Sequence, residues 1–314
     1  MNHARMGSIG VLMGGCSSER EISLKSGRAV YEAMRSAGCH VKALDVVVQQ
    51  ENSIVTLLRE SQSDVAFIAL HGRFGEDGTI QRILENAAMP YTGSGVEASR
   101  LAMNKVLSKE IFLKQGIPVP EYVVVSRGKS LQRDVVLERL KGLPVVVKPS
   151  QEGSSIGITL VTQEEEFAFA VEKAFRYGDE VIVERYIKGR ELTVSILGQA
   201  PLPIVEIRPQ NSFFDFAAKY KDGKTEYSVP AFLPDDVTTK IQKLAWEAHR
   251  ALGCRDFSRV DFILEEERTP YVLEVNTIPG FTSTSLFPKA AKAMGVEFSE
   301  LCLELIRLAY GKKK

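Results

Sequence analysis

Through residues 1–95, short apolar runs alternate with stretches of helical periodicity, and this alternation limits the folds that the chain can adopt. The runs Ser8–Met13 and Asp64–Leu70 are apolar almost throughout, as in strands that are buried on both faces. Between them, apolar side chains recur at helical spacing up to Ala37, and Gly38 follows where a left-handed helix end belongs. The pattern predicts β-α-β winding around a parallel sheet.

Two further regions each mix strands and helices. Residues 96–115 are predicted to form one helix, ended by Gly116 and Pro118. β-branched runs then predict strands, with a helix before the last of them that opens on the capping-box pattern of Thr162 and Glu165. These predicted strands cover residues 122–125, 144–148, 156–161 and 181–186.

The last region is predicted to contain strands at 191–197, 204–207, 260–264 and 271–275, and helices at 237–252 and 298–310. Because 314 residues exceed one typical core, we expect an α/β chain with several domains. These are an N-terminal parallel α/β domain (1–95), a central α+β domain (96–187) and a C-terminal α+β domain (188–314). The polar, aromatic stretch Gln210–Pro234 is predicted to be a lid or a binding loop, because structureless stretches of that length are unusual in compact domains.

Composition excludes several classes of protein. Forty basic residues balance forty acidic ones, so no net field favours nucleic acid or an anionic membrane. The cysteines Cys16, Cys39, Cys254 and Cys302 show no CxxC spacing, which indicates reduced thiols rather than disulfides or a zinc site. No window approaches the ~18 apolar residues of a membrane span. We therefore expect a cytoplasmic protein that binds neither nucleic acid nor membrane.

The strongest local signal consists of two i,i+2 pairs, Arg259 with Asp261 and Glu274 with Asn276, on two predicted strands. Alternation along a strand places the members of each pair on one face. Two carboxylates and an amide oxygen make a hard oxygen site suited to Mg²⁺. A solvated strand face with surface ion pairs explains the same residues, and the pattern alone leaves both interpretations open.

Three loops lie where ligands or turns are expected. The loop Glu152–Gly157 follows the strand that ends at Lys148 and predicts either a phosphate site or a glycine-rich hairpin turn. The segment Gly14–Glu21 follows the first strand, where open α/β sheets bind ligands, although a serine of this segment capping the next helix explains it equally. His71 follows the second apolar run, as a catalyst or as a loop-ordering residue.

Six segments occur in a definite order along the chain. They are Gly-Gly-x-Ser-x-Glu-Arg-Glu from Gly14, His-Gly-x-x-Gly-Glu-Asp-Gly from His71, Tyr-Thr-Gly-Ser-Gly from Tyr91, Lys-Pro-Ser-x-Glu-Gly-Ser-Ser-x-Gly from Lys148, Ala-Lys-Tyr from Ala218 and Glu-Val-Asn-Thr-x-Pro-Gly from Glu274. In this order they resemble the D-alanine:D-alanine ligases of the ATP-grasp superfamily, over essentially the whole chain. Each segment alone is a weak signal, but their shared order makes coincidence a poor explanation. The resemblance implies the ATP-grasp fold.

The resemblance also implies that ATP lies between the central and C-terminal domains. The expected ATP ligands are Lys105 and Lys148 at the phosphates, Lys219 at the γ-phosphate, Glu184 and the backbone near Ile187 at the adenine, and Glu191 at the ribose. The expected ligands of two Mg²⁺ ions, or of Mn²⁺ in their place, are Asp261, Glu274 and Asn276.

For the amino-acid substrates, the resemblance implies two adjacent sites. The expected residues are Glu19 at the ammonium group of the first D-alanine with His71 nearby, Arg259 and the Gly280 N–H at the oxyanion, Ser285 and the Leu286 backbone at the carboxylate of the second D-alanine, and Ser154 with Tyr220 as a hydrogen-bond link to Glu19. The pair Arg185-Tyr186 departs from the Lys-Trp pair that is common in the family, which affects only the expected nucleotide contacts.

The activity implied by the resemblance is ATP-dependent ligation of two D-alanine molecules through an acyl phosphate, for peptidoglycan precursor synthesis, by a homodimer. A D-alanine:D-lactate ligase shares this chemistry, and Tyr220 argues against it. A nucleotide-binding regulator without turnover is a second alternative. Such a regulator does not need every group that stabilises developing charge, whereas the sequence retains the whole set of Lys148, Arg259, Asp261, Glu274 and Asn276.

Overall fold

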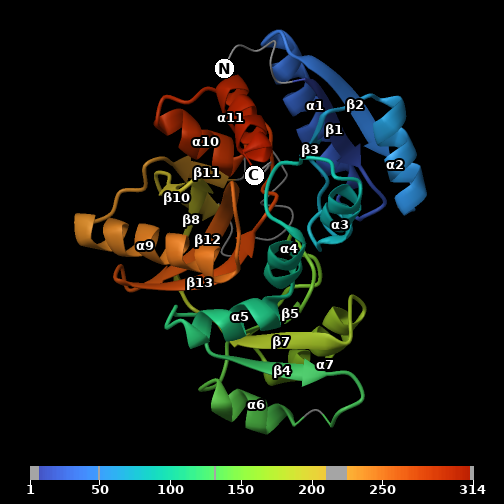
Figure 1. The fold of residues 1–314 in the computed structure, drawn as a ribbon. Helices are drawn as coiled ribbons and strands as arrows, with labels where there is room; N and C mark the ends of the chain where they lie inside the picture. The colour runs from blue at the N-terminus through green and yellow to red at the C-terminus, as the bar shows by residue number, and fades with distance from the viewer. Residues whose placement is uncertain (1–6, 49, 131, 210–224, 312–314) are drawn as a thin grey trace.

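The computed structural model describes residues 7–48, 50–130, 132–209 and 225–311. Three sheets organise these residues, with helices packed on each sheet (Figure 1). No helix among the described residues is both long and apolar enough to cross a membrane. Most of the predicted loop Gln210–Pro234 lies outside the described residues.

The first sheet is parallel, as the alternating sequence pattern predicted. Its strand order is β2-β1-β3, and β2 was not among the predicted strands. Its elements are β1 (Ser8–Gly14), α1 (Arg20–Ser36), β2 (His40–Val46), α2 (Glu51–Glu60), β3 (Val65–Ile68) and α3 (Thr79–Asn86). Every residue of β1 is buried, because Ile9 and Val11 pack with α1 on one face while Leu12 packs with α2 and α3 on the other. The carboxyl ends of β1 and β3 therefore lie side by side and carry the loops that contain Glu19 and His71.

Helix α1 approaches β1 closely because small residues form part of its buried face. Its buried residues are Ser23, Ser26, Gly27, Val30 and Met34. A Cβ at Gly27 would lie 2.4 Å from the Cβ of Met13, so only glycine permits this separation of helix and strand. The close packing brings the hydroxyl groups of Ser23 and Ser26 within hydrogen-bond distance of the loops at the carboxyl end of the sheet.

Helix α11 (Phe298–Tyr310) completes the core of the first sheet from the far end of the chain. Figure 1 shows this red helix beside the blue helix α1, and the two are in contact. Leu301, Leu305 and Ile306 of α11 belong to the same buried cluster as Ile9 and Val30. The N-terminal sheet and the C-terminal helix therefore share one hydrophobic core.

The second sheet is antiparallel, with the order β4-β7-β5-β6. Its elements are β4 (Tyr122–Ser126), α6 (Arg133–Arg139), β5 (Val145–Pro149), β6 (Thr159–Val161), α7 (Glu164–Phe175) and β7 (Glu180–Arg185). Val145 and Val147 of β5 pack with Phe167 of α7 on one face, which leaves Lys148 on the opposite face. The loop Glu152–Gly157 joins two paired antiparallel strands, so it is a hairpin connection, and a ligand role stays compatible with that geometry.

The third sheet is also antiparallel, with the order β11-β10-β8-β12-β13 and β9 paired to β8. Its strands are β8 (Gly189–Leu197), β9 (Ala200–Pro201), β10 (Val205–Pro209), β11 (Thr225–Ser228), β12 (Phe257–Glu265) and β13 (Thr269–Asn276), and the helices α4 (Val96–Met103), α5 (Lys105–Lys114), α9 (Asp235–Ala251) and α10 (Leu286–Ala293) accompany them. Ala98, Ala102 and Phe112 of α4 and α5 pack in one cluster with Val194 and Val260 of this sheet. The domain limits at residues 95 and 187 stay predictions.

Residues 96–115 do not form the single helix that the sequence predicted. Asn104 is extended (φ −91°, ψ 103°), and its side-chain oxygen accepts hydrogen bonds from the N–H groups of Val106 (3.0 Å) and Leu107 (3.1 Å). The capping asparagine therefore ends α4 and starts α5, and this local preference outweighs the helical periodicity. The break makes Lys105 the first residue of α5.

Three smaller expectations also differ from the structure. The capping box of α7 is formed by Gln163 and Glu166 rather than Thr162 and Glu165, because the helix begins one residue later than predicted. The strand expected at 156–161 is confined to β6, because the hairpin turn occupies the residues before it. The segment expected to be a loop as far as Pro234 contains β11, which pairs with β10.

Candidate active site

A cavity of about 430 Å³ is lined by strands of the second and third sheets and by loops and helix α1 at the edge of the first sheet. The loops after β1 and β3, the β5–β6 hairpin and the strands β7, β8, β12 and β13 contribute its walls. The site residues that the sequence placed in the described part of the chain all line it: Glu19, His71, Lys105, Lys148, Ser154, Glu184, Ile187, Glu191, Arg259, Asp261, Glu274, Asn276, Gly280, Ser285 and Leu286. Lys219 and Tyr220 lie outside the described residues.

A buried charge cluster, formed by Lys109, Glu184 and Lys148, lies at one wall of the cavity. The Glu184 carboxylate is 2.7 Å from the Nζ of Lys109 and 2.7 Å from the Nζ of Lys148, and its side chain is only 4% exposed. Burial would raise the pKa of Glu184, but the two lysines hold it below its ordinary value. Burial lowers the pKa of Lys109 to about 8, against the attraction of Glu184. With two cations for one anion, the cluster favours an anionic ligand beside Lys148.

Lys109 was not among the predicted site residues, although its spacing from Lys105 is a usable signal. Lys109 follows Lys105 by four residues in α5, so the two side chains share one face of the helix. Lys105 points to the cavity, where its Nζ lies 3.2 Å from Glu274 and donates to the carbonyl oxygen of Glu152 at 2.6 Å. One helix face therefore supplies cations to two neighbouring parts of the site.

The two polar pairs on β12 and β13 face each other as the sequence predicted. Arg259 lies opposite Asn276, and Asp261 lies opposite Glu274. Arg259 donates two hydrogen bonds to Asp261, at 2.8 and 2.7 Å, and the Asn276 amide donates a third at 3.1 Å. All four residues line the cavity, which favours a ligand site over a solvated strand face, and the metal-site interpretation stays a prediction.

The chemistry of this donor set fits a hard divalent cation. Asp261 and Glu274 provide carboxylate oxygens and Asn276 an amide oxygen on adjacent strands. Among the residues that the structure describes, no group of three or more His, Cys, Asp or Glu side chains is placed to hold a metal ion. A cation at Asp261 and Glu274 would therefore need further oxygens from a ligand, as Mg²⁺ commonly takes them from substrate phosphates.

Glu19 lies at the junction of two loops and a hairpin. The Ser154 hydroxyl donates a hydrogen bond to its carboxylate, and a Cβ at Gly72 would lie only 2.8 Å from the Glu19 Oε2. The serine cap considered for α1 does not form, because Glu19 itself is the N-cap residue. Ser17 instead accepts the Glu19 N–H at 3.2 Å and donates to the carbonyl oxygen of His71 at 2.7 Å. These contacts present a buried carboxylate to the cavity.

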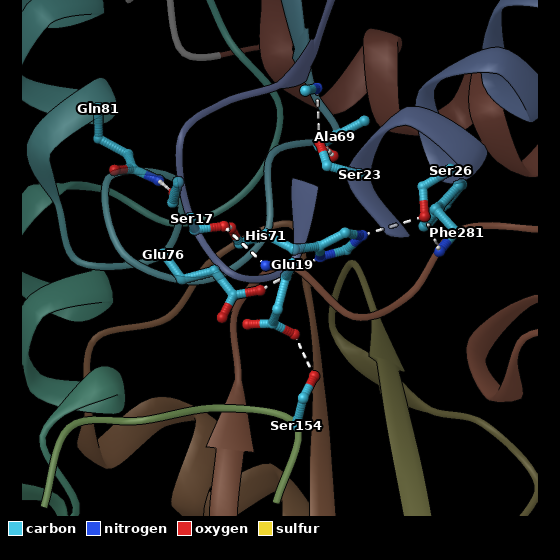
Figure 2. Close-up of polar contacts among 12 residues, drawn as sticks. Ser17, Glu19, Ser23, Ser26, Ala69, His71, Glu76, Gln81, Ser154 and Phe281 are labelled. Atoms are coloured by element: carbon cyan, nitrogen blue, oxygen red, sulfur yellow. Dashed lines mark hydrogen bonds and ion pairs between the residues drawn. The ribbon is translucent and has the colours of Figure 1, made fainter. Parts of the chain in front are cut away.

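His71 is the centre of a hydrogen-bonded chain that sequence analysis did not foresee (Figure 2). Its Nδ1 lies 3.3 Å from the Glu76 carboxylate, and its Nε2 lies 3.0 Å from the Ser26 hydroxyl. Burial raises the pKa of Glu76; the contact with His71 opposes this shift, and the nearby Glu19 adds to it. Glu76 lies within the His-Gly-x-x-Gly-Glu-Asp-Gly segment, whereas nothing in the local sequence marks Ser26.

The segment from Gly280 to Leu286 forms another part of the cavity wall. Ser285 is the N-cap residue of α10, and its Oγ accepts the Thr282 N–H at 3.1 Å. Leu286 is the first residue of that helix, where backbone N–H groups have no intrahelical partner and attract anions. A Cβ at Gly280 would approach the Ser285 Oγ to 3.3 Å. This wall is suited to a carboxylate.

Comparison with known proteins identifies the family. The family model described as D-ala D-ala ligase C-terminus matches residues 111–307, and the one described as D-ala D-ala ligase N-terminus matches residues 42–94. A D-alanine--D-alanine ligase of Geotalea uraniireducens is 49% identical over 301 residues, covering 96% of this chain and 95% of that protein. A D-alanine--D-alanine ligase of Geobacter sulfurreducens is 50% identical over 294 residues, which cover 93% of this chain and 91% of that protein.

Solved structures agree with the sequence matches. The Bacillus anthracis D-alanine--D-alanine ligase complexed with ATP has a TM-score of 0.85 at 33% identity and covers 97% of this chain and 98% of that chain. Another structure of the same enzyme has a TM-score of 0.87 at 36% identity, with the same coverage. These matches confirm the expected ATP-grasp fold. Since family models, relatives and structures agree over nearly its whole length, the chain belongs to the D-alanine–D-alanine ligase family.

Proposed function

We propose that the chain ligates two D-alanine molecules to D-alanyl-D-alanine, converting ATP to ADP and phosphate, for peptidoglycan precursor synthesis. The observation that carries the proposal is the single cavity in which Lys105 and Lys148, the paired groups of β12 and β13, and Glu19 lie together. Such a ligation requires three kinds of group. These are cations that bind phosphates, oxygen ligands that bind a divalent ion, and a carboxylate that binds an ammonium group. The relatives described above are named D-alanine--D-alanine ligases, and the solved structure from Bacillus anthracis is complexed with ATP.

For the nucleotide, the proposal assigns the cationic wall to the phosphates. Lys105 and Lys148 would contact phosphate oxygens, with Lys219 at the γ-phosphate. The remaining ATP contacts are proposed as Glu184 and the Ile187 backbone at the adenine and Glu191 at the ribose hydroxyls. Asp261, Glu274 and Asn276 would hold two Mg²⁺ ions, or Mn²⁺ in their place, which when bound neutralise phosphate charge.

For the amino acids, the proposal places the first D-alanine against the loops of the parallel sheet. Glu19 would hold its ammonium group, with His71 nearby. Ser285 and the Leu286 N–H would hold the carboxylate of the second D-alanine. Ser154 would keep Glu19 oriented through their hydrogen bond, with Tyr220 extending the link.

The proposed reaction has two steps. A carboxylate oxygen of the first D-alanine attacks the γ-phosphorus of ATP, the bond to the β-phosphate oxygen breaks, and ADP leaves. The amine of the second D-alanine, after losing a proton, attacks the acyl carbonyl and forms a tetrahedral oxyanion. Arg259 and the Gly280 N–H stabilise that charge, and phosphate leaves as the amide forms. The Ser154–Glu19 link is the proposed path for the amine proton.

Incubation with ATP, Mg²⁺ and D-alanine tests the proposal. Dipeptide and phosphate in equal amounts are expected, whereas ester formation with D-lactate would indicate the D-lactate ligase, and ATP binding without turnover would indicate a regulator. Arg259→Gln should abolish most turnover, and Arg268→Gln, an exposed arginine on the β12–β13 turn, should retain it. The homodimer implied by the family also stays a proposal, which sedimentation velocity tests.

A further inference from the structure

We infer that Ser26 is a positioning residue that fixes the tautomer of His71 and the backbone that carries the Gly280 N–H. The inference deepens the proposed function, because it assigns the support of the oxyanion-binding backbone to a hydroxyl on α1. Ser26 lies far from Gly280 in sequence, in the first helix of the fold, and only 1% of it is exposed. Its role is indirect, through His71 and Phe281.

Ser26 makes a polar connection between the loop after β3 and the segment after β13. Its Oγ lies 3.0 Å from the Nε2 of His71 and accepts a hydrogen bond from the Phe281 N–H at 3.3 Å. Figure 2 shows the hydroxyl between the imidazole ring and the Phe281 backbone, with Glu76 on the other side of the ring. One buried hydroxyl therefore joins the loop after β3 to the segment after β13.

The direction of each hydrogen bond follows from counting donors. The Phe281 N–H can only donate, so the Ser26 oxygen accepts there. Among the described residues, the hydroxyl proton of Ser26 has His71 Nε2 as its hydrogen-bonding partner, and a buried hydroxyl proton without an acceptor would be costly. Ser26 therefore donates to Nε2, which leaves the ring proton on Nδ1, facing the Glu76 carboxylate at 3.3 Å. The neutral Nδ1–H tautomer is thereby selected.

The same hydroxyl restrains Gly280 through its neighbour. The ring of Phe281 is anchored in the core, with centroids 5.4 Å from Phe67 and 5.6 Å from Phe287. Its N–H is held by Ser26, so the peptide that links Gly280 to Phe281 is restrained on its N–H side, directly after the residue that carries the Gly280 N–H. A preorganised backbone donor stabilises an oxyanion more than a mobile one, because no reorganisation is needed as the charge develops.

The test compares two buried serines of the same helix face. Ser23, three residues before Ser26, donates to the Ala69 carbonyl oxygen at 2.7 Å and accepts the Gly14 N–H at 2.8 Å, without touching His71. Ser26→Ala should lower kcat by roughly three- to tenfold with the KM for ATP unchanged, as expected for one lost hydrogen bond felt in the transition state. Ser23→Ala should keep kcat while losing at least as much stability. Equal kcat in Ser26→Ala and wild type, or parallel losses in both variants, would overturn the inference.

A second measurement does not depend on ligase activity. The chain has four histidines, so ¹⁵N-histidine labelling gives a simple spectrum in which His71→Gln identifies the His71 signals. We expect a protonated Nδ1 and an unprotonated Nε2 in the wild type, and a change in this pattern in Ser26→Ala but not in Ser23→Ala. A protonated Nε2 in the wild type would refute the inference. Absence of turnover in the wild-type protein would refute the proposed function. The measured tautomer of His71 would still test the role of Ser26 in that case.

Discussion

In the buried cluster of Lys109, Glu184 and Lys148, removing the anion should lower the free energy of unfolding. Removing the cation of Lys109 should leave it unchanged or raise it. Glu184→Gln leaves two buried ammonium groups without their anion, and breaking a buried pair costs about 3–5 kcal/mol. Lys109→Met leaves a one-to-one pair between Lys148 and Glu184. Because the pKa of Lys109 falls from 10.5 to about 8, burying its charge is unfavourable by about 3 kcal/mol at 1.36 kcal/mol per pKa unit. The methionine variant should therefore match or exceed the wild type at pH 7, by up to about 3 kcal/mol.

The pH dependence has a definite sign. Since the folded-state pKa of Lys109 lies below its ordinary value, the unfolded chain holds the proton more tightly between about pH 8 and 10.5. Stability from this group therefore rises with pH across that window, as the folded state sheds the buried charge. Lys109→Met lacks this rise, so its advantage over the wild type should shrink between pH 8 and 10.5.

Urea unfolding at pH 7 and at pH 9.5 measures both effects. Lys114→Met, which removes an exposed lysine from the same helix, is the control and should change the free energy of unfolding by less than about 0.5 kcal/mol. If Lys109→Met destabilises the protein as much as Glu184→Gln does at pH 7, the charge count is the wrong explanation. An advantage of Lys109→Met that does not change with pH would refute the titration of Lys109.

Three further predictions concern the cavity and the helix break. Glu274→Gln should cut turnover severely while circular dichroism stays unchanged, and near-normal rates at saturating Mg²⁺ would remove Glu274 from the metal site. Ser154→Ala loses its hydrogen bond to Glu19, so kcat/KM for D-alanine should fall up to about tenfold in steady-state assays with little change in the KM for ATP. Asn104→Ala should lower the free energy of unfolding by about 1 kcal/mol and raise the KM for ATP, because Lys105 begins the helix that Asn104 caps; an unchanged urea midpoint would show that the cap contributes nothing.

The polar pairs of β12 and β13 could be predicted because their geometry is local. Alternation along a strand puts Arg259 and Asp261 on one side, and the short turn between the strands brings Glu274 and Asn276 opposite them. The parallel sheet was predictable for the same reason, since each element carries its own periodicity. Roles of single residues came from resemblance to a family, and they stay proposals.

Other features depend on partners far along the chain, so local patterns do not reveal them. Ser26 contacts His71 and Phe281, 45 and 255 residues away, and its own helix gives no sign of either contact. The break at Asn104 is a different case. The local sequence favours both a continuous helix, through its apolar periodicity, and a helix start at Asn104, through its capping side chain. Helix α10 was missed although Ser285 and Pro288 are typical of a helix start.

The shared core of the first sheet and α11 has a consequence for synthesis on the ribosome. Val30 and Met34 of α1 are fully buried, and their cluster includes Leu301 and Ile306, which are translated more than 250 residues later. The N-terminal unit therefore leaves the ribosome with an apolar face that no early segment covers. Chaperones that bind nascent apolar surface should act on this face throughout most of elongation, and release should coincide with emergence of α11. A stalled chain that ends before Phe298 should remain chaperone-bound, whereas one extended past Tyr310 by a tethering linker should become protease-resistant.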